Sequence, residues 1–269
     1  MPTWSTASDW DSNQEEQGVI HDSFGDHQAD VVEQGLSPDS IPGLFSFFSF
    51  NEDINSGDSV ATDYYGGNSA NPSGGVSFGD TQFLNASMFE FDGSGAVTIP
   101  YESDYEPDSI VVGMIVNSDV TNDYQKLLTK QYSGDWNAPR AEYALSIFVD
   151  DEYAFQTNDG SGDVEVATST GSNDVGQYRL VIGQADSSTL SIHARGQSYS
   201  EDNSRSINGI GYSGQNRDVI IGGRESGEYY TGSIQSAFFG NTLLSNSEID
   251  ELWGSLYQNA SLTTGKKQV

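Results

Sequence analysis

Three carboxylates lie close together in the stretch Glu248-Ile249-Asp250-Glu251, next to a tryptophan at position 253. Retaining glycosidases use two carboxyl groups about 5–5.5 Å apart that flank one glycosidic bond. In a β-strand, Glu248 and Asp250 would lie on the same face, whereas in an α-helix about 200° would separate them. The local structure therefore decides whether these residues can act on a sugar.

The surrounding residues indicate a helix over 244–257. Ser245 followed three residues later by Glu248 is the pattern of a capping box. The apolar residues recur at the helical spacing i, i+3, i+4 and i+7 and form one stripe: Ile249, Leu252, Trp253, Leu256. The acidic side chains then lie near the helix start or point away from the stripe. We therefore expect no catalytic role for them.

The chain is strongly acidic along its whole length. Its 269 residues include 40 Asp and Glu against 10 Lys and Arg, a formal net charge of -30. Self-repulsion at this charge weakens a compact state at low salt, and molar salt shortens the screening length to roughly 3 Å. We expect a protein built for an extremely saline environment. A disordered acidic chain is the alternative, but 35% hydrophobic and 12% aromatic residues are enough for a core.

Composition also excludes several kinds of site. The excess of acid argues against nucleic-acid binding, which needs basic residues at the phosphates. The absence of Cys excludes disulfides and thiolate metal sites. No apolar run approaches the roughly 20 residues of a membrane span, so we expect no membrane insertion. The first residues have neither a basic region nor an apolar stretch, so we expect no signal peptide.

From about residue 43 onward, the pattern predicts an all-β domain. Short alternating or apolar runs are separated by Gly, Asn, Asp and Ser, with no βαβ rhythm, which is typical of an antiparallel sandwich. The expected strands are 44–50, 87–93, 96–100, 109–118, 143–150, 152–158, 164–170, 178–185, 189–196, 218–223 and 232–240. We expect three regions: an N-terminal arm (1–42), the sandwich (43–259) and a polar tail (260–269).

Four segments in this order resemble the laminin-G-like, concanavalin A-like jelly roll: LFSFFSFNEDINSGDSVATD (44–63), SMFEFDGSGAVTIP (87–100), SIVVGMIVNS (109–118) and VIIGGRESGEYYTGSIQSAFFGNTLLSNSEIDELW (219–253). The resemblance covers about residues 43–257. It implies two antiparallel sheets, a concave face and a short C-terminal helix. It also implies a binding or adhesion module, of a kind often stabilised by calcium.

The arm resembles a second group of proteins. Its residues 4–21, which read W-x-T-A-S-D-W-D followed by E-Q-G-V-I-H, are similar to proteins of tailed viruses and proviruses of halophilic archaea. This resemblance implies a non-enzymatic virion surface protein, assembled in the host cytoplasm and carried on the particle as a decoration, turret, spike or fibre component. The arm would dock it to other virion proteins or to sibling subunits, and the sandwich would bind host-surface glycans. One alternative is a secreted or cell-surface carbohydrate-binding protein or glycoside-active enzyme of a haloarchaeon. Another is a purely structural decoration module that binds no ligand.

Calcium is the one cofactor that the loops suggest, because oxygen-rich loops suit hard cations. The best candidate ligands are Asp53, Asp58, Asp63 and Asp92. The resembling family carries acidic residues after the Gly-x-Ile of its last strand, where this chain has Gln235 and Ser236. A solvated acidic surface that binds no metal is the alternative explanation of these clusters.

Two loops combine aromatic rings with the polar groups that bind sugar hydroxyls. The first, 131–140, contains Tyr132, Asp135, Trp136, Asn137 and Arg140. The second, 225–232, contains Glu228 and Tyr229, followed by Tyr230, which we expect in the core. We expect Trp136 to contact a glycan or a partner; packing on a neighbouring loop or subunit is the alternative. His193 alternates with apolar neighbours and is expected on the polar face of its strand, in a plain surface role or a pH-insensitive hydrogen-bonding role and not as a catalytic base.

Overall fold

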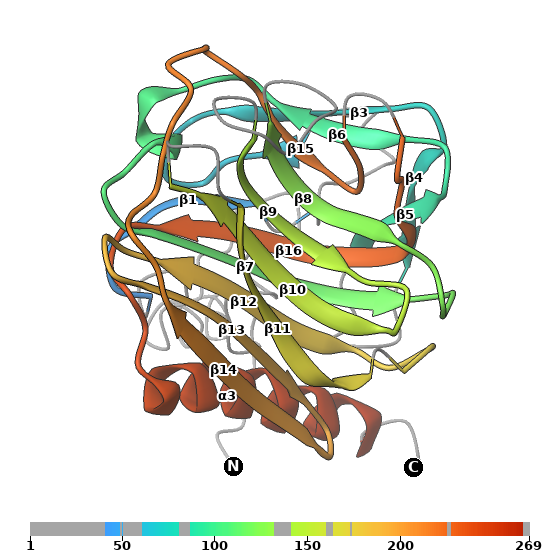
Figure 1. The fold of residues 1–269 in the computed structure, drawn as a ribbon. Coiled ribbons are helices and arrows are strands. Elements are labelled where there is room, and N and C mark those ends of the chain that lie inside the picture. The colour runs from blue at the N-terminus through green and yellow to red at the C-terminus, as the bar shows by residue number, and fades with distance from the viewer. Residues whose placement is uncertain are drawn as a thin grey trace, which may run out of the picture.

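The computed structural model describes most of the chain beyond residue 40 (Figure 1). The described residues are 41–48, 50, 61–80, 87–131, 141–159, 164–172, 174–224 and 227–265. Almost all of the expected arm lies outside these ranges, so its role in attachment stays a prediction.

The first of two eight-stranded antiparallel sheets has the order β14-β13-β12-β7-β16-β5-β4, and β1 also pairs with β16. Its strands are β1 (Leu44–Phe48), β4 (Val76–Asp80), β5 (Ser87–Asp92), β7 (Ile110–Ser118), β12 (Arg179–Ala185), β13 (Thr189–Gly196), β14 (Tyr199–Ser206) and β16 (Thr231–Gly240). The long strands β7 and β16 pair along almost their whole length at its centre.

The second sheet has the order β11-β10-β9-β8-β15-β6-β3-β2. Its strands are β2 (Ala61–Thr62), β3 (Ser69–Ser73), β6 (Ala96–Ile99), β8 (Gln125–Gln131), β9 (Ala141–Ile147), β10 (Glu152–Asn158), β11 (Val164–Ser172) and β15 (Val219–Ile221). A 3-10 turn, η3 (Ser103–Tyr105), precedes β7. A tight turn at Asp150 and Asp151 joins β9 to β10, where the amide of Asp151 donates to Phe148 O over 2.8 Å.

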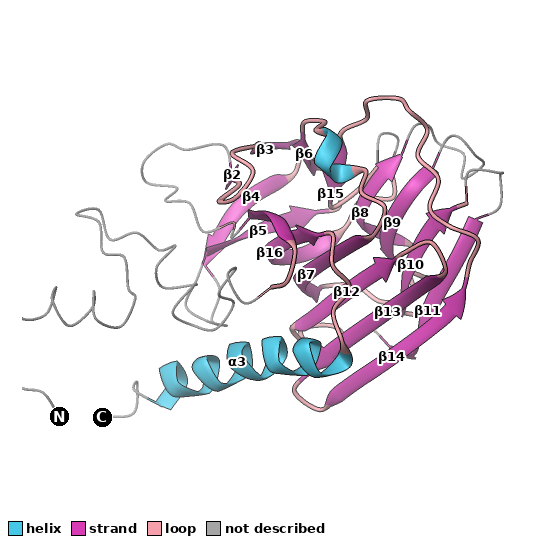
Figure 2. Cartoon of the chain, turned by 90° about the vertical axis from the view of Figure 1, so that its left-hand side faces the viewer, coloured by secondary structure: helices cyan, strands magenta, loops and turns pink. Residues whose placement is uncertain are grey.

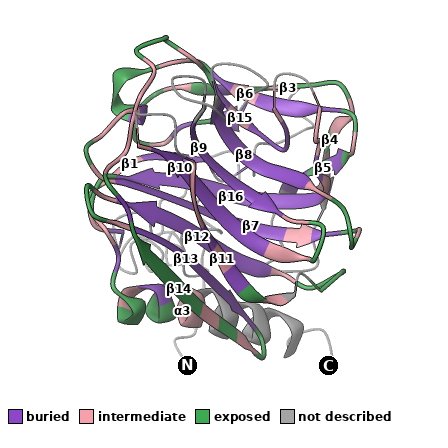
Figure 3. Ribbon diagram, viewed as in Figure 1, coloured by how far each residue is buried: buried purple, intermediate pink, exposed green. Residues whose placement is uncertain are grey.

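The main core lies between the two sheets. Successive side chains of a strand point to opposite faces. In β7, Val112, Met114 and Val116 belong to the core between the sheets. Val111 and Ile115 belong to a second apolar cluster on the opposite face. Both faces of this sheet are therefore buried at its centre, as Figure 3 shows, and the predicted β-sandwich is confirmed.

Helix α3 (Asn246–Gly265) covers the outer face of the first sheet (Figure 2). Its Ile249 and Leu252 pack against residues of β1, β7, β12 and β16, among them Phe47 and Phe238. Phe238 also lies across Gly113, its cross-strand partner on β7, where a Cβ would overlap the Phe238 ring. Among the described residues, no helix combines the length and the apolar character that a membrane span requires.

The capping box at the start of α3 is confirmed. The Ser245 amide donates to Glu248 Oε2 over 2.7 Å, and the Glu248 amide donates to Ser245 Oγ over 3.3 Å. The Ser245 hydroxyl also donates to Glu248 Oε2 over 2.7 Å, and this bond, together with the one from the Ser245 amide, lowers the pKa of Glu248. Glu248 and Asp250 are thus on a helix, about 200° apart around its axis, and do not converge. The helix continues to Gly265, so residues 260–265 of the expected tail are helical.

All eleven expected strands are present, but five further strands were not predicted: β2, β3, β4, β8 and β14. The clearest case is β14, whose sequence YSEDNSRS is almost wholly polar. It lies at the edge of the first sheet and is largely exposed (Figure 3). Its pairing with β13 along eight residue pairs, rather than apolar alternation, makes it a strand.

Candidate functional site

Several of the predicted site residues lie outside the described residues. They are Tyr132, Asp135, Trp136, Asn137 and Arg140 of the first loop, and the calcium candidates Asp53 and Asp58. Their roles in binding a glycan or calcium stay predictions.

The two described calcium candidates both hold turns. Asp63 is 2% exposed, and its Oδ1 accepts the amides of Phe47 and Tyr65, each over 2.9 Å. Asp92 Oδ1 accepts both the amide and the hydroxyl of Ser94, over 2.9 and 2.7 Å. Within the described ranges, no group of three or more His, Cys, Asp or Glu side chains is placed to hold a metal ion.

Glu228 and Tyr229 are partly buried. Glu228 forms an ion pair of 2.7 Å with Arg224, and its main-chain oxygen accepts the amide of Lys126 over 3.0 Å. Burial lowers the pKa of Lys126 to about 7, and the charge of Glu228 opposes this shift. Tyr229 packs against Gly223. Tyr230 is fully buried, with its ring 5.8 Å from that of Phe91, which confirms it as a core residue.

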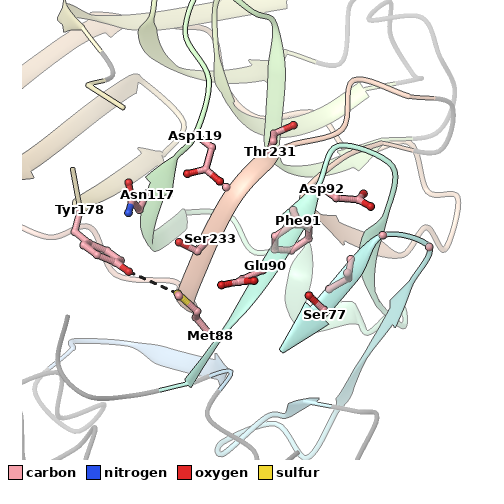
Figure 4. A pocket seen from close by; sticks show the side chains of 14 residues that line it. Ser77, Met88, Glu90, Phe91, Asp92, Asn117, Asp119, Tyr178, Thr231 and Ser233 are labelled. Atoms are coloured by element: carbon pink, nitrogen blue, oxygen red, sulfur yellow. Dashed lines mark hydrogen bonds between the residues drawn. The ribbon is translucent and has the colours of Figure 1, made fainter. Parts of the chain in front are cut away.

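A pocket of about 760 Å³ opens beside β4, β5, β16 and β7 of the first sheet (Figure 4). This volume is within the range of small-molecule sites, roughly 300–1,000 Å³. The pocket is lined by Gly74, Gly75, Val76, Ser77, Met88, Glu90, Phe91, Asp92, Asn117, Asp119, Tyr178, Thr231, Gly232 and Ser233. The first sheet therefore offers a concave site that sequence reasoning did not predict.

Strand register assembles the polar floor of this pocket. Ser77 on β4 is paired with Glu90 on β5, Glu90 with Ser233 on β16, and Ser233 with Asn117 on β7. Directly paired residues point to the same face, with Cβ atoms roughly 4.5–5.5 Å apart. We call Ser77, Glu90, Ser233 and Asn117 the polar row. Asp92 and Thr231 form the next cross-strand pair beside it.

The side chains of the polar row lack hydrogen-bond partners. Ser77, Glu90, Ser233 and Asn117 make no side-chain hydrogen bond or ion pair within the part of the chain that the structure describes. Ser233 is only 8% exposed, and Asn117 Oδ1 is a buried atom without a partner. Most buried polar groups in proteins are hydrogen-bonded. The polar row is therefore free to bind water or a ligand.

The walls of the pocket differ in chemistry. Tyr178 and Asn117 lie on one side in Figure 4, and Ser77 and Asp92 on the other. The Tyr178 hydroxyl donates to Met88 Sδ over 3.6 Å, which presents the ring as an apolar wall. Glu90, Asp92 and Asp119 supply three carboxylates, and none of the lining residues is Lys, Arg or His. The site combines hydroxyl, amide and carboxylate groups with the ring of Tyr178.

The signal for Glu90 was present in the sequence. Glu90-Phe91-Asp92 alternates carboxylate, aromatic, carboxylate within a predicted strand, and Phe91 is a core residue. Alternation with a buried residue places both carboxylates on the outer face. Asn117 and Ser233 had no comparable signal, because their placement depends on which strands are neighbours.

His193 lies on the predicted polar face of β13, since its neighbours Ile192 and Ala194 belong to the core between the sheets. This face is buried here: His193 is 6% exposed and hydrogen-bonds with Asp202 and Ser191, so the expected surface position is wrong and the expected hydrogen-bonding role is confirmed. Its Nδ1 lies 2.6 Å from Asp202 Oδ1, and its Nε2 lies 3.1 Å from both Ser191 Oγ and Gln184 Nε2. The Gln184 amide is oriented by two bonds to the main chain of Leu244. Gln184 therefore donates to Nε2, and His193 is neutral with its proton on Nδ1.

These contacts resemble a Ser-His-Asp triad, but they hold the start of α3 against β13. Ser191 is 6% exposed, and neither it nor His193 lines the pocket. Asp202 also accepts Asn246 Nδ2 over 3.1 Å, and Arg195 joins Asp202 to Asp250. Burial alone would raise the pKa of Asp202, but bonds from His193 and Arg195 hold it below its usual range.

We expect acid to weaken this network through His193. Burial lowers the pKa of His193 below its ordinary value of about 6.5. As pH falls, the unfolded state therefore binds the proton first. The stability that neutral His193 contributes is complete above about pH 6.5 and is lost as pH falls through the folded-state pKa. The free energy of unfolding then changes by at most about 1.4 kcal/mol per pH unit. Denaturant unfolding from pH 8 to 5 measures it. The His193→Gln variant should be less stable at pH 8 but show a shallower slope; an equal slope in both proteins would contradict the assignment.

Comparison with known proteins agrees with this architecture. Residues 91–250 match a laminin G family model described as the concanavalin A-like lectin/glucanases superfamily. The match spans more than half of the chain, and the chain belongs to this superfamily. No curated protein sequence matches it.

Solved structures show the same fold at low sequence identity. Domain 4 of AbnA, a GH43 extracellular arabinanase from Geobacillus stearothermophilus in complex with arabinotriose, is 12% identical with a TM-score of 0.54, over 78% of this chain and 97% of that one. A mutant Trypanosoma rangeli sialidase with trans-sialidase activity is 16% identical with a TM-score of 0.57, over 94% of this chain. The chain spans only 40% of that sialidase. At these identities the likeness establishes the fold alone.

Proposed function

We propose that this protein is a non-enzymatic carbohydrate-binding domain whose ligand occupies the pocket over the polar row. The proposal rests on one observation: hydroxyl, amide and carboxylate groups that have no hydrogen-bond partner among the described residues line a cavity beside the Tyr178 ring. Sugars need such a set, because their hydroxyls both donate and accept while their apolar faces stack on aromatic rings. The arabinotriose complex of the arabinanase domain is a further support.

Glycoside hydrolysis is the second candidate, because Glu90 and Asp92 place two carboxylates on one strand facing the pocket. Two observations favour binding over hydrolysis. Asp92 is tied into a turn by both bonds from Ser94. Glu90, Asp92 and Asp119 are also exposed, whereas glycoside chemistry benefits from a site that excludes water.

The binding test uses arabinotriose and an array of plant and host-type glycans at 3 M KCl, with titration calorimetry on the best ligand. Ser233→Phe fills the centre of the polar row and should weaken binding at least about tenfold. Ser204→Phe makes the same change on exposed β14 at the far edge of the sheet and should not. Asn117→Ala is the second variant if Ser233→Phe folds poorly. Unchanged affinity in both pocket variants would reject the site, and sugar release that Glu90→Gln abolishes would favour the enzyme.

We further propose where the domain works: on the surface of a virion of a halophilic archaeal virus, facing host glycans. Residues 1–42 would attach it to other virion proteins and to sibling copies. The net charge of -30, the resemblance of the arm and the lectin-type superfamily support this proposal. Particles purified on a high-salt density gradient should contain the protein at a fixed ratio to the major capsid protein. Recovery only in the soluble or cell-surface fraction would favour a secreted haloarchaeal protein.

A further inference from the structure

Building on the proposed function, we infer that the pocket binds a neutral oligosaccharide laid across the strands and rejects sugars that carry a carboxylate. Nothing about the fold requires this selectivity, since the superfamily architecture is compatible with many ligands. It follows from the particular side chains of the polar row and from the carboxylates beside it.

The charged groups of the pocket can only accept hydrogen bonds. Glu90, Asp92 and Asp119 line it, and no Lys, Arg or His among the described residues does. An ionised carboxylate has no donor, so it must receive O–H or N–H groups from the ligand. Sugar hydroxyls supply them. The carboxylate of a uronic or sialic acid would face like charges at close range without a cationic partner among the described residues, which is unfavourable.

The uncharged groups of the row require a ligand that both donates and accepts. Ser233 is 92% buried, and its hydroxyl has no partner among the described residues. A sugar hydroxyl can accept from the Ser233 hydroxyl and donate to the carboxylate of Glu90, its cross-strand neighbour.

The length of the row indicates more than one sugar ring. Ser77 and Asn117 are separated by three neighbouring-strand spacings, since β5 and β16 lie between their strands. At roughly 4.8 Å for each spacing, the row is about 14 Å long. An oligosaccharide that crosses the strands could contact the whole row, whereas a monosaccharide would reach only part of it.

The test compares matched ligands that differ in one group: a neutral oligosaccharide, its monosaccharide, and its uronate counterpart, in which one CH₂OH is a carboxylate. The affinities are measured by calorimetry at 3 M KCl, with a chelator present so that divalent cations cannot bridge the uronate to the carboxylates of the pocket. Screening then limits charge effects to groups within roughly 3 Å, so the comparison reports on contacting carboxylates. We expect the uronate to bind at least about tenfold more weakly than the neutral oligosaccharide, and the monosaccharide to bind more weakly as well.

Glu90→Gln replaces one negative charge with an amide that can donate hydrogen bonds. The affinity for the neutral oligosaccharide should then exceed the affinity for its uronate by about threefold or less. Asp119→Asn makes the same change at another carboxylate of the pocket. It is the variant to test if Glu90→Gln abolishes all binding. A uronate that binds as tightly as the neutral sugar, and is blocked by Ser233→Phe, would overturn the selectivity while leaving the site intact. If no sugar binds, or if Ser233→Phe changes nothing, the proposed function fails and the inference fails with it.

Discussion

Replacing Phe239 with alanine is expected to lower the free energy of unfolding by about 3–5 kcal/mol. Phe239 is fully buried on β16, the central strand that pairs with both β7 and β1. Its ring lies edge-on to Tyr105, with centroids 4.9 Å apart, and 6.4 Å from the ring of Phe45. Alanine would remove these contacts and leave a cavity between the two packed sheets, which cannot move together to close it.

Guanidinium chloride would itself screen charge, so urea unfolding in 3 M KCl is the measurement. Tyr65→Ala removes a ring that is 44% exposed and should change stability by less than about 0.5 kcal/mol. Phe239→Leu, which keeps most of the volume, should cost less than Phe239→Ala. A loss of under about 1 kcal/mol for Phe239→Ala would mean that the core at β16 is not packed as described.

Lowering KCl from 3 M to 0.1 M is expected to destabilise the protein by on the order of several kcal/mol, at unchanged sequence. Two like charges about 10 Å apart repel by roughly 0.4 kcal/mol in unscreened water, and many such pairs exist at a net charge of -30. The compact state concentrates these charges, whereas the unfolded chain separates them. Salt therefore stabilises the folded state by screening.

The measurement is the thermal midpoint and the urea-unfolding free energy across a KCl series. Sorbitol at matched water activity is the control, because it favours compact states without screening charge. Sorbitol should restore much less stability than KCl. Equal stability at 0.1 M and 3 M KCl would contradict the salt-adapted interpretation of the composition.

The sequence by itself determined the local structure and much of the architecture. The short apolar run in 109–118 predicted β7, and the Ser245–Glu248 pattern predicted the start of α3. Both signals act between residues a few positions apart, so they can be read without the fold. The ordered motifs then indicated the concanavalin A-like sandwich, which the family match confirms.

Only the tertiary structure decided the site. Ser77, Glu90, Asn117 and Ser233 are far apart along the chain and meet because β4, β5, β16 and β7 are neighbours in one particular register. A shift of one residue would turn each of these side chains to the opposite face. His193 shows the same limit: its polar alternation was read correctly, but the helix that buries that face lies about fifty residues further along the chain. Side-chain environments set by such distant partners cannot be read from local spacing.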